Sequence, residues 1–151
     1  MRIRDLRPAE HDAAIALWHE AALTRPWNDP RADLDRALAG PSSTVLAAVP
    51  DGGDGLLGTV MVGHDGHRGW MYYLAAAPRG EGTGRALVAA AEAWLSAHVP
   101  KVQLMVRGGN PDASDFYAHL GYERSDVSVW QRVVGPGRPA TPSPGLLGSQ
   151  E

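Results

Sequence analysis

The stretch that decides the fold reads Arg79-Gly80-Glu81-Gly82-Thr83-Gly84-Arg85-Ala86-Leu87. It follows an apolar, strand-like run at residues 71–77 and opens a helix-favouring run at residues 86–97. Glycines at alternate positions leave one side of the loop without side chains. Its backbone N–H groups can then surround an anion, to which the helix N-terminus adds a partial positive charge. With Arg79 as a nearby cation, the sequence predicts a phosphate-binding loop between a strand and a helix.

The spacing of the glycines separates this loop from two better-known phosphate loops. A dinucleotide-binding fold requires G-x-G-x-x-G after the first strand of a parallel β-α-β unit, whereas the spacing here is G-x-G-x-G. The Walker pattern is absent as well. A nucleotide-dependent oxidoreductase is therefore the weakest of the functional hypotheses.

Composition limits the class of protein. The 151 residues suffice for one domain with a core, and the contents of 44% hydrophobic and 21% charged residues are ordinary for a globular protein. A net charge of -3 gives no electrostatic reason to expect nucleic acid, and no apolar run is long enough to cross a membrane. The absence of cysteine excludes a thiol nucleophile and thiolate metal ligands. We expect a cytoplasmic protein without a metal.

Periodicity and turn residues predict the order of the elements around the loop. Three strands joined by glycine-rich turns precede the loop and form an antiparallel meander. The predicted elements are a strand at 2–6, helices at 9–23 and before Gly40, strands at 44–49, 57–62 and 70–77, a helix at 86–97, a strand at 101–106, a helix from Asn110 to Gly121, and one strand or a strand pair at 123–134. Residues 1–134 form the predicted domain, and the Gly/Pro-rich residues 135–151 are expected to be disordered.

A second motif runs from Asn110 to Tyr122 and reads N-x-x-A-x-x-x-Y-x-x-L-G-Y. If this motif is considered without the first one, Tyr117 is predicted to be an ordinary helix residue whose ring packs in the structure. Both motifs in this order, however, resemble the GNAT (Gcn5-related) N-acetyltransferase superfamily: the first its acetyl-CoA pyrophosphate signature, the second its other cofactor motif. The resemblance covers residues 2–134 and implies an α/β fold, a mixed, mostly antiparallel twisted sheet with helices on both faces.

A finer resemblance connects the chain to the YpeA-type bacterial acetyltransferases. It rests on residues 23–30, 58–61, 65–69 and 72–74. It implies acetyl-CoA as co-substrate and leaves the acceptor open.

The family resemblance also implies the residues that contact acetyl-CoA. They lie at the end of the strand, in the loop and in the second motif: Leu74, Ala75, Ala76, Arg79, Gly80, Glu81, Gly82, Thr83, Gly84, Arg85, Asn110, Ala113 and Tyr117. The loop departs from the family, because Pro78 directly precedes Arg79 where relatives usually have two intervening residues. An ungapped register would put Glu81 in the arginine position. We assign the arginine to Arg79, because residues 82–88 then fit the family's helix start.

The resemblance further implies direct acetyl transfer in a ternary complex, with Tyr117 as general acid for the leaving thiolate and a backbone N–H, that of Ala76, as oxyanion donor. The position of the family's usual glutamate base is Tyr72, and tyrosine is a poor base at neutral pH. A water held by Tyr72 or Tyr73, the Asp65/His67 turn, or no dedicated base are the alternatives.

The segment between the first two helices walls the acceptor pocket in this fold. Arg25, Trp27, Asn28 and Asp29, together with Asp65, are therefore the predicted acceptor-binding residues, although Asn28 or Asp29 capping a helix with Trp27 buried is an equal alternative. The resemblance implies that the acceptor is a primary amine on a small molecule, a protein N-terminus or a lysine. A non-catalytic acyl-CoA-binding module is the competing function. Homodimer pairing through Val127, Val129 and Val133 is a further expectation.

Overall fold

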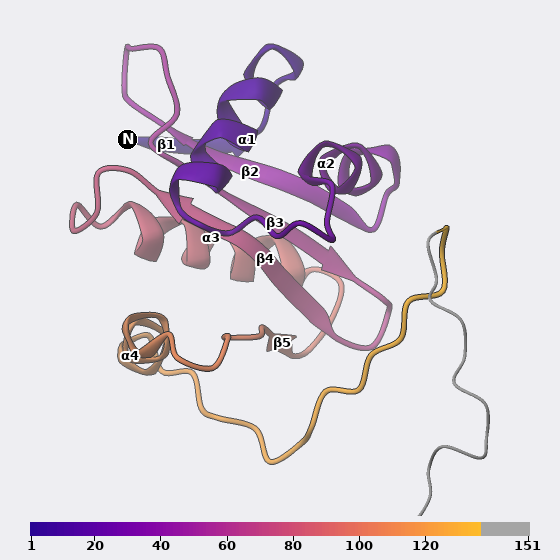
Figure 1. Ribbon diagram of the computed structural model, residues 1–151. Coiled ribbons are helices and arrows are strands. Elements are labelled where there is room, and N and C mark those ends of the chain that lie inside the picture. Colours follow the sequence, from indigo (N-terminus) through magenta and orange to yellow (C-terminus); the bar gives the residue numbers. More distant parts are fainter. Residues whose placement is uncertain (137–151) are drawn as a thin grey trace, which may run out of the picture.

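The structure, a computed structural model, describes residues 1–136 and contains one mixed sheet (Figure 1). The strands are β1 (Arg2–Asp5), β2 (Ser43–Val49), β3 (Gly58–His64), β4 (Gly69–Ala76) and β5 (Val102–Gln103), in the spatial order β1-β2-β3-β4-β5. The first four strands pair antiparallel, and β4 pairs with β5 in parallel. This arrangement confirms the predicted sheet.

Four α-helices connect the strands, and their ends follow from local chemistry. They are α1 (His11–Glu20), which continues a 3-10 turn η1 (Pro8–Glu10), then α2 (Pro30–Ala39), α3 (Thr83–Ser96) and α4 (Pro111–His119). Asp29 caps α2, because its carboxylate accepts hydrogen bonds from the backbone N–H groups of Arg31 at 3.0 Å and Ala32 at 3.2 Å. A proline opens both α2 and α4, where a missing N–H costs no helical hydrogen bond.

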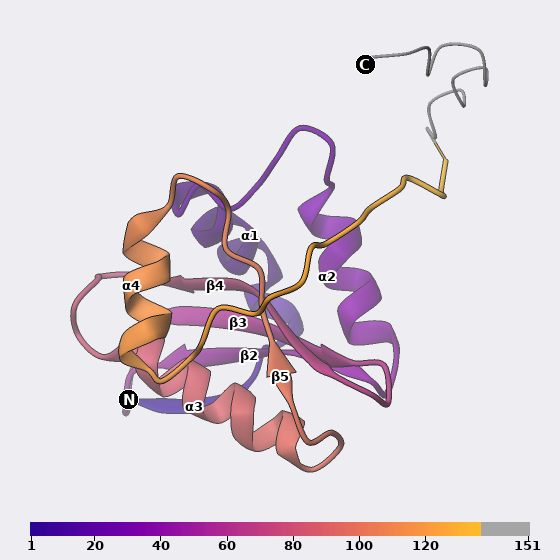
Figure 2. The ribbon, with the colours of Figure 1, turned by 90° about the horizontal axis from the view of Figure 1, so that it is seen from below.

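Helices cover both faces of the sheet, as the family resemblance implies. Figure 1 shows α1 and α2 on one side and α3 and α4 on the other, and Figure 2 views the molecule from the side of α3 and α4. The α1–α2 side forms one hydrophobic cluster around Trp18 and Leu34, and the α3 side forms a second around Leu87 and Leu95. All four of these side chains are fully buried.

Strand β5 is much shorter than the predicted strand at 101–106. It pairs with β4 only at Gly69↔Val102 and Trp70↔Gln103, after which the two chains separate. The part of β4 that follows Trp70 therefore has no strand beside its second edge among residues 1–136. This open edge runs toward the loop before α3.

The prediction of one or two strands at 123–134 is wrong for the structure, which places neither helix nor strand in that segment. Alternating apolar residues favour a strand, but a strand also needs a partner edge and a surface on which to pack. Here Val127 and Val129 are 70% and 63% exposed, and Trp130 is 93% exposed. The predicted tail at 135–151 lies, from residue 137 onward, outside the described residues.

Candidate active site

The open edge of β4 carries two outward-pointing backbone donors. Ala77 donates its N–H to the Leu57 carbonyl oxygen at 2.9 Å, on the β3 side. Because alternate residues of an antiparallel strand point their N–H groups in opposite directions, the N–H groups of Ala76 and Leu74 point away from β3. They face the side from which β5 has departed.

The glycine-rich loop leads from this edge into an uncapped helix. Gly80 and Gly82 have φ of 85° and 80°, a conformation that glycine adopts at little cost, and Gly82 is the N-cap of α3 without any side-chain hydrogen bond. The first-turn N–H groups of a helix have no intrahelical acceptor, so they can bind an anion. Arg79 and Glu81 both lie exposed in the loop. The loop therefore fits a pyrophosphate group.

Two glycines allow the site's elements to approach closely. A Cβ on Gly58 would lie 2.6 Å from the Ala75 carbonyl oxygen and 3.0 Å from Thr83 Cγ2, so only glycine lets β3 pass beneath the start of α3. A Cβ on Gly84 would lie 3.3 Å from the Phe116 ring. The two sequence motifs therefore meet in space, with the first turn of α3 packed against α4.

Tyr117 lies on α4 beside this contact. The Asn110 side chain caps the helix by accepting the Ala113 N–H at 3.2 Å. The Tyr117 ring packs edge-on against Phe116 and Tyr122, at centroid distances of 5.1 and 5.6 Å. Burial raises the pKa of Tyr117 to about 12, so its hydroxyl stays protonated at neutral pH.

Tyr117 and Leu74 also border the same hydrophobic cluster on the α3 side. The structure thus brings the predicted acid, the strand residues and the loop to one end of the sheet. In Figure 2, α4 lies beside the start of α3 at this end.

Tyr72 has the properties of a poor base. Its side chain is 41% exposed and stacks on Trp70 with ring centroids 6.4 Å apart. Burial, and secondarily the negative charge of Asp65, raises the pKa of Tyr72 above its usual value. The hydroxyl is therefore protonated at neutral pH and can only hold a water or donate a hydrogen bond.

The Asp65/His67 turn lies at the far end of β4 from the cofactor loop. The Asp65 carboxylate accepts the N–H groups of His67 at 2.8 Å and Arg68 at 2.7 Å, and these backbone hydrogen bonds lower the pKa of Asp65. Between His67 and Leu74 the strand extends by roughly 20 Å, at about 3.3 Å per residue. This position separates both residues from Leu74 and from the cofactor loop, and the Asp65 carboxylate accepts hydrogen bonds within its own turn.

The predicted acceptor segment is held mainly by backbone contacts. The Arg25 guanidinium donates to the carbonyl oxygens of Ala22 at 2.8 Å and Thr24 at 2.7 Å, and the backbone N–H of Asn28 donates to the Arg25 carbonyl oxygen at 3.0 Å. Together with the Asp29 cap of α2, these contacts favour the helix-capping alternative for Asp29.

The alternative in which Trp27 is buried is wrong, because its side chain is 72% exposed. The guanidinium of Arg107, in the chain that follows β5, lies 6.0 Å from the centre of its ring. No motif in the sequence pointed to Arg107, since only the fold brings residues 25–29 next to the chain after β5.

A group of contacts around Tyr73 is the other feature that sequence reasoning missed. The Tyr73 hydroxyl donates to Asp33 Oδ2 at 2.7 Å, and its ring stacks on Trp18 with centroids 4.2 Å apart. Trp18 Nε1 in turn donates to Thr59 Oγ1 at 2.8 Å. These contacts join α1, α2, β3 and β4 through side chains that have no motif in the sequence.

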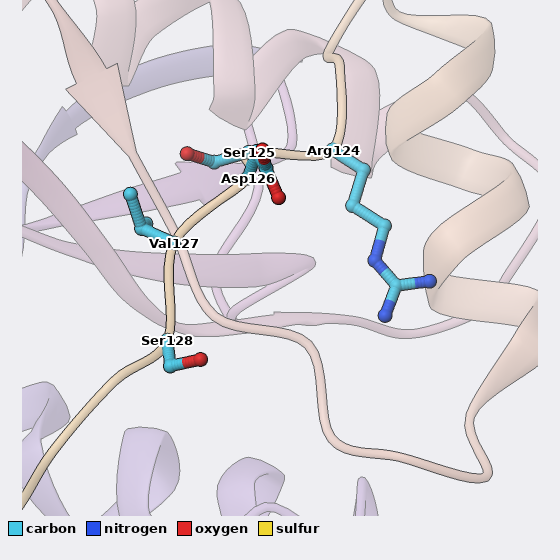
Figure 3. Close-up of a pocket in the computed structure, with 5 residues that line it drawn as sticks. All are labelled: Arg124, Ser125, Asp126, Val127 and Ser128. Carbon is cyan, nitrogen blue, oxygen red and sulfur yellow. The ribbon is translucent and has the colours of Figure 1, made fainter.

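A surface hollow lies elsewhere. It has a volume of about 500 Å³ and is lined by five consecutive residues, Arg124, Ser125, Asp126, Val127 and Ser128, of the extended segment after α4 (Figure 3). None of the predicted site residues lines it. Within residues 1–136, no three metal-ligating side chains come together, and none of the helices has the length and apolar character needed to cross a membrane.

Comparison with known proteins identifies the family. Residues 12–122 match the sequence model of the acetyltransferase (GNAT) family. The chain is 40% identical over 138 residues to acetyltransferase ECA0875 of Pectobacterium atrosepticum, covering 89% of this chain and 96% of that protein. The chain therefore belongs to the GNAT acetyltransferase family, whose members use acetyl-CoA, and the predicted resemblance is confirmed.

Solved structures support the same fold. The aminoglycoside acetyltransferase AAC(6')-Iy, in complex with a CoA-containing bisubstrate analogue, superposes with a TM-score of 0.70 at 17% identity, over 89% of this chain and 98% of that one. A transcriptional regulator from Bacillus halodurans superposes with a TM-score of 0.74 at 18% identity, over 87% and 99%. At such identities the likeness concerns the fold alone.

Proposed function

We propose that the protein transfers an acetyl group from acetyl-CoA to a primary amine by direct reaction in a ternary complex. One observation carries the proposal: β4 continues beyond its last pairing with β5 and leads into the uncapped start of α3, and the first turn of α3 packs against α4, the helix of Tyr117. Acetyl-CoA supplies an acetyl group on a thiolate leaving group, and the remaining requirements fall to the chain's own residues.

The loop and the first turn of α3 are the proposed pyrophosphate site. Backbone N–H groups after Gly82 provide the donors, and Arg79 adds a positive charge. Leu74, Ala75 and Ala76 would align the thioester along β4, while Asn110 and Ala113 shape the start of α4. The negatively charged Glu81 carboxylate would repel a phosphate, which supports the assignment of the arginine position to Arg79.

The chemical step requires an oxyanion donor and a proton donor. We assign the first to the Ala76 N–H, because it points away from β3 at the open edge and a donor held in place needs no reorganisation during reaction. We assign the second to Tyr117, whose protonated hydroxyl can donate to the leaving sulfur. A water held by Tyr72 takes the amine proton in this proposal, and the distant turn at Asp65 and His67 takes no part.

The acceptor would approach from the α1–α2 side, opposite α3 and α4. Trp27 is exposed there with the Arg107 guanidinium against it, and Arg25 and Asp29 fix the backbone around it. An aminoglycoside is the acceptor of one structural relative by its name. For this chain the proposal covers primary amines of small molecules, protein N-termini and lysines.

Binding is tested first, by thermal stabilisation with acetyl-CoA compared with CoA, NAD and ATP. A ligand that binds only the native state raises the melting temperature by mass action. Arg79→Ala should reduce the stabilisation by acetyl-CoA, and Glu81→Ala should preserve or increase it. The reverse ranking would contradict the assignment of the loop register, and absence of any shift would overturn the cofactor site despite its geometry.

Turnover is tested by CoA release over a panel of amines and peptides. Tyr117→Phe should lower kcat by about 10²-fold, within the usual range for a general acid, while acetyl-CoA affinity stays similar. Tyr122→Phe is the matched control, since it removes a neighbouring hydroxyl that donates to Glu92 at 2.7 Å. Binding without turnover across the panel would instead support the non-catalytic acyl-CoA-binding module.

The homodimer is also part of this proposal. Val127, Val129 and Val133 are 70%, 63% and 54% exposed, and covering them would remove apolar surface from water. Sedimentation of the wild type and of Val129→Lys tests it. A dimer that the substitution dissociates supports this interface, and a monomeric wild type overturns it. A cytoplasmic location is proposed with the enzymatic function and can be tested by cell fractionation.

A further inference from the structure

The backbone of β4 breaks register at Tyr73. Thr59 pairs with Ala75 and Met61 pairs with Tyr72, so β4 contains one more residue than β3 between these two pairs, as in a β-bulge. Tyr73 has a φ of 49°, in the left-handed region that a residue with a Cβ rarely adopts. Glycine would adopt this conformation readily. Because a tyrosine stands here instead, contacts of its side chain must hold the backbone.

Those contacts come from two other elements. The ring stacks nearly parallel on Trp18 of α1, with an interplanar angle of 21°, and the hydroxyl donates to Asp33 of α2. Trp18 is itself fixed by its indole N–H bond to Thr59 of β3, and both partners are fully buried. The Tyr73 side chain therefore has one position, defined by the packed core and by one carboxylate.

Residues two apart in a regular strand share one face, but Met71 packs with the cluster on the α3 side and Tyr73 with the cluster on the α1–α2 side, so the break reverses the alternation. Tyr73 packs with the cluster on the α1–α2 side, whereas Leu74 packs with the cluster on the α3 side that also contains Tyr117. The peptide between these two residues sets the direction of the N–H groups farther along the open edge. The Tyr73–Asp33 bond, on the α1–α2 side, therefore holds the residue whose backbone conformation sets the direction of the next N–H group, that of Leu74.

We propose that Tyr73, held by Asp33, is a positioning residue that orients the Leu74 and Ala76 N–H groups for acetyl transfer. This inference rests on the proposed function, because it presumes that these N–H groups receive the developing oxyanion. Tyr73 acts through the backbone and need not touch the acetyl group or the amine.

The test compares variants that keep the ring with variants that change the carboxylate. Tyr73→Phe retains the stack on Trp18 and loses only the hydroxyl. Asp33→Ala removes the acceptor, whereas Asp33→Asn retains an oxygen that can accept the same bond. Arg36→Ala is the control, because Arg36 pairs with Asp33 from an exposed position and its loss leaves the Tyr73–Asp33 bond in place. All assays run well below the melting temperature of each variant.

We expect Tyr73→Phe and Asp33→Ala each to lower kcat by about tenfold or more, since misplaced donors lose stabilisation of the transition state. The dissociation constant of acetyl-CoA should change by less than about twofold, because the loop and α3 are untouched. Asp33→Asn should recover most of the activity, Arg36→Ala should retain it, and the double variant should be no slower than either single one. In the unliganded protein, Tyr73→Phe should move the amide NMR resonances of Leu74 and Ala76.

The outcomes distinguish a failure of the Tyr73 positioning role from a failure of the proposed acetyltransferase function. If the wild type acetylates an amine and Tyr73→Phe does so at the same rate, the inference is overturned and the proposed function stands. If Asp33→Asn is as slow as Asp33→Ala, or if the loss falls on acetyl-CoA affinity, a positioning role through this bond is also overturned. A wild type that binds acetyl-CoA but acetylates nothing in the panel overturns the proposed function, and the inference with it.

Discussion

Replacing Gly58 with alanine should disrupt the packing beneath the cofactor loop. The added Cβ would lie 2.6 Å from the Ala75 carbonyl oxygen, 2.8 Å from Leu87 Cδ1 and 3.0 Å from Thr83 Cγ2. The oxygen belongs to the backbone of β4 and cannot rotate away, and Leu87 is fully buried. Either the sheet or α3 must therefore shift.

Overpacking of this kind costs typically 1–3 kcal/mol, and the backbone contact places Gly58→Ala near the upper value, at about 3 kcal/mol. For a chain of this length about 1 kcal/mol lowers the melting temperature by roughly 2–4 °C, so the expected fall is roughly 6–12 °C. Because Thr83 begins α3, a displaced helix start should also weaken stabilisation by acetyl-CoA. Urea denaturation measures the loss of stability, and differential scanning calorimetry with and without acetyl-CoA measures the melting temperature and the stabilisation by the ligand.

Gly40→Ala is the matched control. Gly40 has a φ of -120° and open space around its Cβ position, so the same chemical change meets no atom. It should be neutral or stabilise the protein by up to about 1 kcal/mol through the unfolded state. If Gly58→Ala melts within about 2 °C of Gly40→Ala, the close approach of β3 and α3 is not as described here and the reasoning is refuted.

Three further predictions concern titration and buried hydrogen bonds. The Arg4 guanidinium lowers the pKa of Glu10 to about 2, from 4.5, so this pair stabilises the fold above the unfolded pKa and loses that contribution as pH falls from about 4.5 toward 2. Because solvent reaches both side chains and screens the pair, its contribution is about 1 kcal/mol. The advantage of wild type over Glu10→Gln in urea denaturation should shrink in that window, and an advantage that is constant with pH would disprove the linkage. Because the pKa of Tyr117 is about 12, loss of its proton should not lower kcat at any pH below ~10. A wild-type pH–rate profile that falls below pH ~10, with the fall absent in Tyr117→Phe, would show that Tyr117 loses its proton earlier and would contradict this protonation state. Thr59→Val should cost about 1–3 kcal/mol in calorimetry by leaving the Trp18 indole N–H buried without an acceptor, and a variant as stable as wild type would argue against that bond.

The two motifs were readable from the sequence because their chemistry is local. Glycines at alternate positions between a strand and a helix predict an anion-binding loop from neighbouring residues alone, and Asn110 caps α4 within one turn of chain. The same locality made Asp29 readable as a cap, although the sequence left an acceptor-binding role equally open. Element order and sheet type followed from turn residues and apolar periodicity.

The segment at 123–134 shows where local pattern fails. Its alternation satisfies every local requirement of a strand, yet within residues 1–136 it pairs with no strand, and Trp130 is almost fully exposed. Strand formation depends on a neighbour that the pattern itself does not contain.

The catalytic geometry depended on tertiary structure in the same way. Residue types made Tyr117 a candidate, but its burial and its place beside the start of α3 come from packing between α3 and α4. The contacts of Tyr73 with Trp18 and Asp33 join residues 55 and 40 positions apart, and no short-range pattern relates them. Local sequence predicted the glycine-rich loop, the helix starts and the family, because these depend on residues that are neighbours along the chain. Only the tertiary structure decided which donors remain open on β4 and which side chains hold them, because both depend on which strand is absent and which helices pack nearby.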